Sequence, residues 1–334
     1  MNKKRILITG ANGVIGRFLA DKYHKMGHEV VGIDDYSNSD QEHSEFLIKK
    51  ADAAEFLLVD RLCKNVDIIF HCCCAPCEGF SNVSPCFIGR SILDTTLAVA
   101  SAAGNNDVKL IYNFTSMARY GNNPNLPFTE DMLTSPVDPY GASKVAAENI
   151  LNTMSKIYGF KVIHIVPHNV FGLRSRWDDP QRGVLPIFTN QALLGLPLTI
   201  FNDGNQKRSF SFVEDAFSFY EDFLNIDIDN GEVYNVGPDD ESSMIKINDL
   251  ADLVLDLTKS KSEKVYIEKK NDVHLAYASS NKIREKFGWK SQVNLVNEIE
   301  KIVKNIMQKG PKKFRYNRVI EIEKFCPSFW KNNV

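Results

Sequence analysis

Three glycines placed directly after a short apolar run constrain the fold of this chain more than any other feature. Residues Arg5–Thr9 are mostly apolar, and Gly10, Gly13 and Gly16 lead from them into a helical pattern over Val14–Met26. A glycine loop between a buried strand and a helix is the context of a dinucleotide-binding turn. The first glycine permits the tight turn, the next admits a pyrophosphate to the backbone, and the last allows close helix packing. The alternative interpretation is a glycine turn without a ligand.

The same alternation of strand and helix continues through the first half of the chain. Short apolar runs separated by helical patterns are typical of a parallel sheet whose strands are buried on both faces. The predicted strands are Arg5–Thr9, His28–Asp34, Glu55–Asp60, Val66–Cys72, Lys109–Ser116 and Lys161–Val170. The predicted helices are Val14–Met26, Ser91–Ala103 and Ser143–Tyr158. The fold class is therefore α/β, a Rossmann-type doubly wound parallel sheet.

The chain has 334 residues, which is longer than a single hydrophobic core usually supports, so two domains of unequal size are expected. The alternation stops after Phe171, where a loop precedes a helical stretch over Leu185–Leu194. We expect residues 1–172 to form the NAD-binding domain, joined by about 209–236. Residues 173–208 and 237–334 should form a smaller C-terminal α/β substrate lobe.

The residues after the second predicted strand indicate which dinucleotide is bound. Asp34 ends this strand about twenty residues beyond the glycines, where its carboxylate can accept hydrogen bonds from the adenosine ribose. Asp35 adds a second negative charge, and no arginine is near in sequence, so NAD is preferred over NADP. Asp60 is a candidate for an adenine contact or a simple turn residue. Further cofactor-binding candidates in the glycine loop are Asn12, Val14 and Ile15.

A tyrosine and a lysine one helical turn apart form the predicted chemical centre. Tyr140 and Lys144 lie on the same face of a helix. A phenol has a pKa of about 10, but a nearby ammonium and a positive nicotinamide ring would stabilise the phenolate. Tyr140 could then accept a hydroxyl proton as hydride leaves the same carbon for NAD. Ser116 would hydrogen-bond the reacting oxygen, with Thr115 orienting it; the alternative is a capping serine and a packing tyrosine.

Together these motifs identify a resemblance to the extended short-chain dehydrogenases/reductases of the NAD-dependent nucleotide-sugar epimerase/dehydratase family, of the UDP-glucose 4-epimerase type. Pro167–Gly172 resembles the family's Asn-Val-Tyr-Gly segment, and Phe201–Asp215 resembles its late arginine motif. The resemblance implies that Asn169 contacts the substrate phosphates or nearby backbone and that Arg208 binds the diphosphate of a nucleotide sugar. It also implies a homodimer. The resemblance further implies that the cofactor is lined by Cys72, Cys73, Cys74 and Pro167.

Departures from the family pattern narrow the reaction. Met117 and Ala118 stand where dehydratases carry Asp-Glu, and the glutamate of the decarboxylases is absent. The default is therefore oxidation of the sugar at C4 followed by re-reduction, which is epimerisation. The alternatives are a 4-dehydrogenase that releases the ketone, a 4,6-dehydratase and a non-catalytic NAD-binding regulator.

A second phosphate-binding group is less clear from the sequence. Lys269 or Lys270 stands where many relatives have a second phosphate-binding arginine. Arg174, Arg176 and Arg182 could take over this role, or they could be solvated loop charges. His168 is either an extra acid or base near the sugar or a buried, hydrogen-bonded histidine.

Charge and cysteine content exclude several other classes. The net charge of −2 and the lack of a basic block argue against nucleic-acid or anionic membrane binding. The seven cysteines are odd in number and mostly crowded together, so we expect reduced thiols. A metal or redox site at His71, Cys72, Cys73, Cys74 and Cys77 is disfavoured. The three adjacent thiols would point to alternate faces of a strand, and no second Cys or His pair follows at the needed distance. With no export signal and no long apolar run identified, we expect a cytoplasmic protein.

Overall fold

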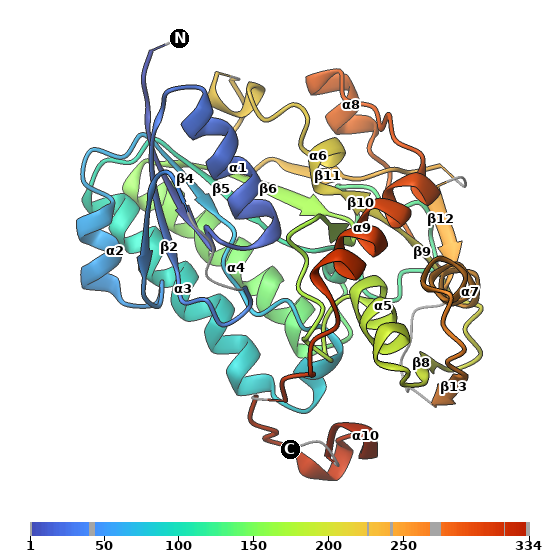
Figure 1. The fold of residues 1–334 in the computed structure, drawn as a ribbon. Coiled ribbons are helices and arrows are strands. Elements are labelled where there is room, and N and C mark those ends of the chain that lie inside the picture. Colours follow the sequence, from blue (N-terminus) through green and yellow to red (C-terminus); the bar gives the residue numbers. More distant parts are fainter. Residues whose placement is uncertain are drawn as a thin grey trace.

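A seven-stranded sheet in which every neighbouring pair is parallel forms the centre of the molecule (Figure 1). The computed structural model describes residues 2–39, 44–225, 227–240, 243–267, 275–316 and 318–331. The strands, in their order across the sheet, are β11 (Val233–Val236), β6 (Lys161–Pro167), β5 (Leu110–Phe114), β4 (Ile68–His71), β1 (Arg5–Thr9), β2 (Glu29–Asp34) and β3 (Leu47–Lys50). The order reverses between β4 and β1, so the predicted doubly wound fold is confirmed. Ligands of such sheets bind at this reversal, beyond the carboxyl ends of the strands.

Helices cover both faces of the sheet and bury its alternating side chains. Ile6 and Ile8 of β1 belong to the core on one face with Leu19, whereas Leu7 belongs to the core on the other face with Val99. This division follows from the two-residue period of a strand. The helices of this half are α1 (Val14–Lys25), α2 (Phe56–Leu62), α3 (Pro85–Asn105) and α4 (Pro139–Tyr158).

One predicted strand is wrong. Glu55–Asp60 was expected to be the third strand, but most of it lies in α2, and the third strand in the chain is β3. A short apolar run fits a strand or one side of a helix equally well. Here Val59 is fully buried while Leu57 is 71% exposed, which is the one-sided burial of a surface helix.

Several other elements have different bounds from those expected; α3, for example, begins at Pro85 and not at Ser91. Helix α4 begins at Pro139, with the Asp138 carboxylate accepting a hydrogen bond from the amide of Gly141 at 2.8 Å. Tyr140 therefore lies in the first turn of the helix. The last predicted strand is divided, because β6 ends at Pro167 and a separate strand, β7, pairs with β10. Strand β7 spans Val170–Phe171 and β10 spans Ser211–Phe212.

The second half of the chain builds a lobe with its own apolar core, which includes Leu185, Leu198, Leu250 and Ile302. Its helices are α5 (Val184–Leu194), α7 (Ile247–Thr258) and α9 (Leu295–Lys309). Its strands are β8 (Leu198–Phe201) paired with β13 (Lys264–Ile267), and β9 (Lys207–Ser209) between β12 (Met244–Lys246) and β14 (Leu275–Ala276). Short helices α6 (Val213–Ala216) and α8 (Asn281–Phe287) contribute to the first core. The separate cores, together with the return of β11 to the main sheet, support the proposed division into domains.

Helix α3 is long and apolar enough, by length and composition, to cross a membrane, although the sequence analysis identified no such stretch. Half of its apolar window is buried inside the protein. Ile92 and Val99 are almost completely buried, and the helix packs against α2 and α4. These contacts are those of a core helix.

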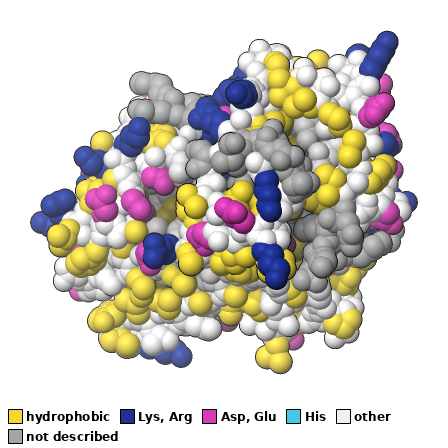
Figure 2. All heavy atoms as spheres, turned by 90° about the horizontal axis from the view of Figure 1, so that it is seen from below, with side chains coloured by type: hydrophobic (Ala, Val, Ile, Leu, Met, Phe, Trp, Pro, Cys, Tyr) yellow, Lys and Arg dark blue, Asp and Glu magenta, His cyan; other side chains and the backbone are white. Residues whose placement is uncertain are grey.

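On the face shown in Figure 2, basic and acidic side chains are interspersed, and hydrophobic side chains gather in several patches.

The end of the chain leaves α9 and runs down one face of the molecule to a short last helix, α10 (Ser328–Lys331), below α5 (Figure 1). We call residues 311–331, of which all but residue 317 are described, the C-terminal strap.

Candidate active site

The glycine loop has the shape of a phosphate cradle. Gly10 has a φ of +66°, and a Cβ there would lie 2.9 Å from Cys73 Cα. A Cβ on Gly16 would overlap the carbonyl oxygen of Gly10. The loop therefore presents bare backbone directly before the N-terminus of α1, where helix amides favour a negative group. These residues fit the pyrophosphate of a dinucleotide.

Asp34 lies at the carboxyl end of β2 beside this loop. Its carboxylate accepts hydrogen bonds from the backbone amides of Asn12 and Tyr36, both at 2.8 Å. Burial raises the pKa of Asp34, and the two amides oppose the rise. Asp35 accepts hydrogen bonds from the amide and hydroxyl of Ser37, so it shapes the following turn.

A cleft of about 900 Å³ runs from Asp34 past the glycine loop to the predicted chemical centre. Most of the predicted site residues line it. They are Gly10, Gly13, Val14, Ile15, Gly16, Asp34, Asp35, Cys72, Cys73, Cys74, Thr115, Ser116, Tyr140, Lys144, Pro167 and Asn169.

Two predicted cofactor residues do not line the cleft. Asn12 is buried behind the loop, where its side chain donates to the Ser39 hydroxyl at 3.1 Å and accepts from Arg17 at 3.2 Å. Asp60 lies on α2 and accepts hydrogen bonds from the side-chain amides of Asn105 and Asn106, both at 2.8 Å. The placement expected for Asp60 is wrong because the strand that should have carried it is a helix. Residues that follow the actual β3, Ala51, Asp52, Ala53 and Ala54, line the cleft instead.

The fold also brings arginines to the Asp34 end, although none is near in sequence. Arg176 donates to the Ser37 carbonyl at 2.8 Å, and Arg318 donates to the Asn38 side chain at 2.7 Å. Each guanidinium is paired with a buried aspartate, Arg176 with Asp178 and Arg318 with Asp179. Asp178 also pairs with Arg315 at 2.7 Å, so two carboxylates lie among three guanidinium groups.

The chemical centre assembles at the carboxyl end of β5 and the start of α4. The Ser116 hydroxyl lies near the Tyr140 phenol, and Tyr140 is only 6% exposed. Lys144 Nζ donates to the Phe114 carbonyl at 2.9 Å and lies 5.9 Å from the centre of the Tyr140 ring. The fold thus brings together all three predicted catalytic residues.

The charge state of Tyr140 depends on what occupies the cleft. Burial is the largest influence and raises the pKa of Tyr140 well above its ordinary value, whereas the Ser116 hydrogen bond lowers it. The protein alone therefore keeps Tyr140 as a neutral phenol. A positive group beside the ring would favour the phenolate, because it stabilises the charged form.

Two sets of buried polar contacts lie next to the chemical centre, one around His71 and one around Glu148. His71 at the end of β4 contacts the Thr9 hydroxyl at 3.0 Å and the Thr96 hydroxyl at 3.2 Å. Burial, with Lys144 nearby, lowers the pKa of His71 to about 3, so the imidazole is neutral. On the other side, the Thr115 hydroxyl donates to the Glu148 carboxylate. Sequence reasoning missed Glu148, which lies two helical turns after Tyr140.

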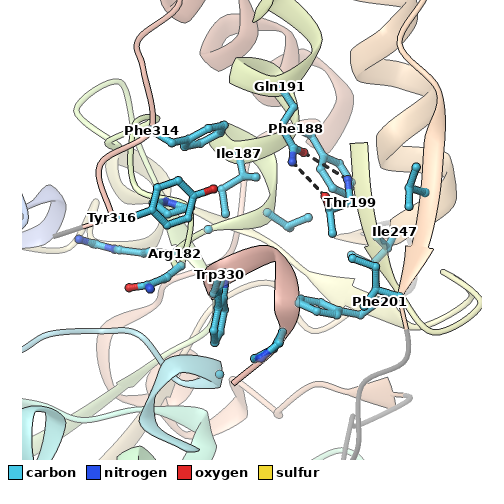
Figure 3. Close-up of a pocket in the computed structure, with 18 of the residues that line it drawn as sticks. Arg182, Ile187, Phe188, Gln191, Thr199, Phe201, Ile247, Phe314, Tyr316 and Trp330 are labelled. Atoms are coloured by element: carbon cyan, nitrogen blue, oxygen red, sulfur yellow. Dashed lines mark hydrogen bonds between the residues drawn. The ribbon is translucent and has the colours of Figure 1, made fainter. Parts of the chain in front are cut away.

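A second, larger cavity of about 1540 Å³ adjoins the cleft. Asn169, Phe171, Arg182 and Gly183 line both, so the two spaces meet beside them. Figure 3 shows Arg182 and Tyr316 on one side of the cavity, with Phe201 and Ile247 on the other. Among the described lining residues there are four cationic side chains and no carboxylate. The four are Arg182, Arg208, Lys313 and Lys324.

The structure places the predicted substrate residues in different ways. Arg208 on β9 lines the cavity. The Asn169 amide donates to the Ser209 carbonyl at 2.9 Å, which ties β7 to β9. Of the three loop arginines, Arg174 lies 3.8 Å from Asp21 and Arg176 is paired with Asp178, so only Arg182 reaches the cavity. Lys269 and Lys270 lie outside the described residues.

His168 lies outside the chemical centre, whereas Cys72, Cys73 and Cys74 line the cleft beside it. His168 is fully buried and lines neither space, and burial lowers its pKa to about 3. The burial expected for a structural histidine is confirmed, but neither ring nitrogen has a hydrogen-bond partner among the described residues. All seven cysteines are free. Burial raises the pKa of Cys73 to about 12, so this thiol stays protonated beside the glycine loop.

Known proteins are similar to this chain in sequence and in fold. The model of the NAD dependent epimerase/dehydratase family matches residues 6–237. A UDP-glucose 4-epimerase of Mycolicibacterium smegmatis is 32% identical over 92% of this chain and 99% of its own. A putative UDP-glucose 4-epimerase of Methanocaldococcus jannaschii is 27% identical over 89% of this chain and 97% of its own.

Solved structures agree with this grouping. The UDP-glucose 4-epimerase of Thermotoga maritima, solved with UDP-glucose, has a TM-score of 0.82 and 25% identity over 91% of this chain and 99% of its own. A UDP-N-acetylglucosamine 4-epimerase of Methanobrevibacter ruminantium has a TM-score of 0.82 and 26% identity over 92% of this chain and 100% of its own. The chain therefore belongs to the NAD-dependent epimerase/dehydratase family of extended short-chain dehydrogenases/reductases, and it is an enzyme whose cofactor is NAD.

Proposed function

We propose that this enzyme is a nucleotide-sugar 4-epimerase that acts by transient oxidation of the C4 hydroxyl. The observation that carries the proposal is the position of the chemical centre. Ser116 and Tyr140 lie in the cleft that contains the glycine loop, and this cleft opens into the cationic cavity at Arg182. A sugar in the cavity can thus reach the tyrosine while its diphosphate meets positive charge.

Each residue has a distinct role in this proposal. Ser116 donates a hydrogen bond to the reacting oxygen, and Tyr140 accepts the hydroxyl proton and later returns it. Lys144, held by the Phe114 carbonyl, keeps positive charge close to the ring. Bound NAD supplies the acceptor for the hydride and adds the positive charge that favours the phenolate.

The cationic cavity supports a diphosphate substrate. Arg208 and Arg182 present guanidinium groups, whose planar fork suits phosphate oxygens. The relatives named above are UDP-glucose and UDP-N-acetylglucosamine 4-epimerases, so UDP-sugars are the first substrates to test. In this proposal Lys269 is a further phosphate ligand, on the family resemblance alone.

The decisive experiment is incubation of the purified enzyme with UDP- and GDP-sugars, with products identified by NMR and mass spectrometry. Epimerisation predicts an inverted C4 hydroxyl with no net NADH. Accumulating ketone with NADH would instead identify a 4-dehydrogenase. A product that has lost water would indicate a dehydratase, and no turnover of any nucleotide sugar would favour a non-catalytic NAD-binding regulator.

Two further features belong to the proposal. We expect a homodimer that uses α3 and α4, and exposed Leu97 and Ile157 on these helices support such a contact. Light scattering after gel filtration should give twice the chain mass of 37.8 kDa. The seven free cysteines suit the reducing cytoplasm, and cell fractionation would check this location.

A further inference from the structure

The C-terminal strap lies across the junction of the cleft and the cavity. Arg318, Val319 and Glu321 line the cofactor cleft. Tyr316 and Trp330 line the substrate cavity, where they lie near Arg182 (Figure 3). One short segment thus contributes walls to both binding spaces.

The first anchor of the strap is Arg318, which is nearly buried in a fork of charged hydrogen bonds. Its two terminal nitrogens donate to the Asp179 carboxylate at 2.9 and 2.7 Å. The same guanidinium donates to Gln181 at 2.8 Å and to Asn38 at 2.7 Å. Arg318 therefore connects the loop after β2 with the loop that precedes α5.

The second anchor is Glu321, whose side chain binds the N-terminal end of α3. Its carboxylate oxygens accept hydrogen bonds from the amides of Cys86 and Phe87, both at 2.8 Å. The Ser84 hydroxyl also donates to the Val319 carbonyl at 2.9 Å. Helix amides with no partner inside the helix are thus satisfied by the strap, and the negative group lies at the favourable end of the helix dipole.

The two anchors attach the strap to different parts of the molecule. Asp179 and Gln181 belong to the loop before α5, whereas Cys86 and Phe87 belong to a helix of the Rossmann half. Between these attachments the strap passes along the walls of both spaces.

We propose that the C-terminal strap is a substrate-retaining element, which encloses the sugar with Tyr316 and Trp330 and holds the oxidised intermediate beside the cofactor. The inference rests on the proposed function. Oxidation moves the hydroxyl proton to Tyr140 and a hydride from the same carbon to NAD⁺, and the return of both completes epimerisation. A ketone that leaves between these steps takes no hydride back, so the reduced cofactor stays behind.

The test compares two variants on the strap. Arg318→Gln combined with Glu321→Ala removes both anchors. Glu323→Ala is the matched control, because its carboxylate makes no side-chain hydrogen bond to any described residue. The loss of two charged anchors should raise the share of released ketone, and the dissociation constant for UDP, by about tenfold. The control should behave like the unaltered enzyme.

A second measurement, limited proteolysis of the unaltered enzyme, requires neither turnover nor a folded variant. UDP with NAD should slow limited proteolysis within the strap of the unaltered enzyme. No protection, or anchor variants with unchanged UDP affinity and ketone release, would overturn the inference. Strap protection by UDP in an enzyme that turns over no nucleotide sugar would reject the proposed function and the retention of an oxidised intermediate, and would leave the strap as a nucleotide-binding element.

Discussion

The Glu148 carboxylate lies 3.0 Å from the Arg119 guanidinium, and both side chains are buried beneath the segment that presents Ser116. Thr115 donates to the same carboxylate. The position of the catalytic hydroxyl therefore depends on an ion pair that touches neither the cofactor cleft nor the substrate cavity.

Glu148→Gln should destabilise the fold. The substitution leaves the buried Arg119 charge uncompensated, a change that typically costs 3–5 kcal/mol. Urea denaturation should show a free energy of unfolding lower by about 3 kcal/mol. The control is Glu300→Gln, which removes an exposed pair with Lys304 and should change stability by less than about 0.5 kcal/mol. Equal effects of the two variants would rule out this role for Glu148.

Tyr140→Phe should abolish most of the activity while sparing the cofactor site. Loss of a general base typically lowers the rate by about 10²–10⁴-fold, and the ring that remains still fills the cleft. Steady-state assays with the best UDP-sugar, together with calorimetric titration of NAD, would measure the two effects. Tyr158→Phe, at an exposed position on the same helix, is the control. Unchanged turnover in Tyr140→Phe would refute its role as base.

Affinity for NAD should fall as the solution is made acidic. Asp34 must be ionised to accept the ribose hydrogen bonds without donating, and burial raises its pKa above the ordinary value of 3.8. Protonation therefore begins at a higher pH than for an exposed aspartate, and affinity is lost as pH falls toward this raised pKa. Fluorescence titrations from neutral pH downward would follow the loss. Asp34→Asn should bind NAD more weakly, with a flat response over the same range.

Gly16→Ala should disrupt the glycine loop. The new Cβ would overlap the Gly10 carbonyl, so the helix must move away from the loop that receives the pyrophosphate. Affinity for NAD should decrease at least tenfold. Gly89→Ala in α3 is a suitable control, since its Cβ meets only the Ser143 hydroxyl at an ordinary 3.7 Å. Normal NAD affinity in Gly16→Ala would show that the cofactor does not use this loop.

Arg208→Gln should weaken UDP binding by about tenfold, because a charged contact with phosphate is lost. Lys207→Gln provides a matched control, because the Lys207 side chain, next to Arg208 on β9, is exposed and does not line the cavity. Calorimetry with UDP would compare them. If the two variants bind UDP equally well, the diphosphate lies elsewhere in the cavity.

The first Rossmann unit and the catalytic set could be predicted because their signals are local. Gly10, Gly13 and Gly16 follow one strand directly, and Tyr140 and Lys144 are separated by one helical turn. The third strand could not be predicted in this way. Its residues, Leu47–Lys50, are mostly exposed at the edge of the sheet, so they lack the apolar pattern of a buried strand.

The contacts made by distant segments escaped prediction for another reason. Arg318 and Asn38 are 280 positions apart, and no local pattern links them. The same holds for Glu321 with Phe87, and for the arginines near Asp34. Such pairings depend on how the finished elements pack, which periodicity does not describe.

The chain leaves the main sheet after β6 and returns at β11, which is the direct neighbour of β6. Everything between these strands is thus a crossover that leaves the carboxyl end of β6 and re-enters the sheet at the start of its parallel neighbour. Its length can change without shifting the register of any other strand, so insertions and deletions in this crossover are compatible with the same hydride-transfer centre. Exchange of α5 and β8, which line the cavity, between relatives is therefore a route to altered sugar preference, whereas α6 belongs to the core of the NAD-binding half and has to be kept.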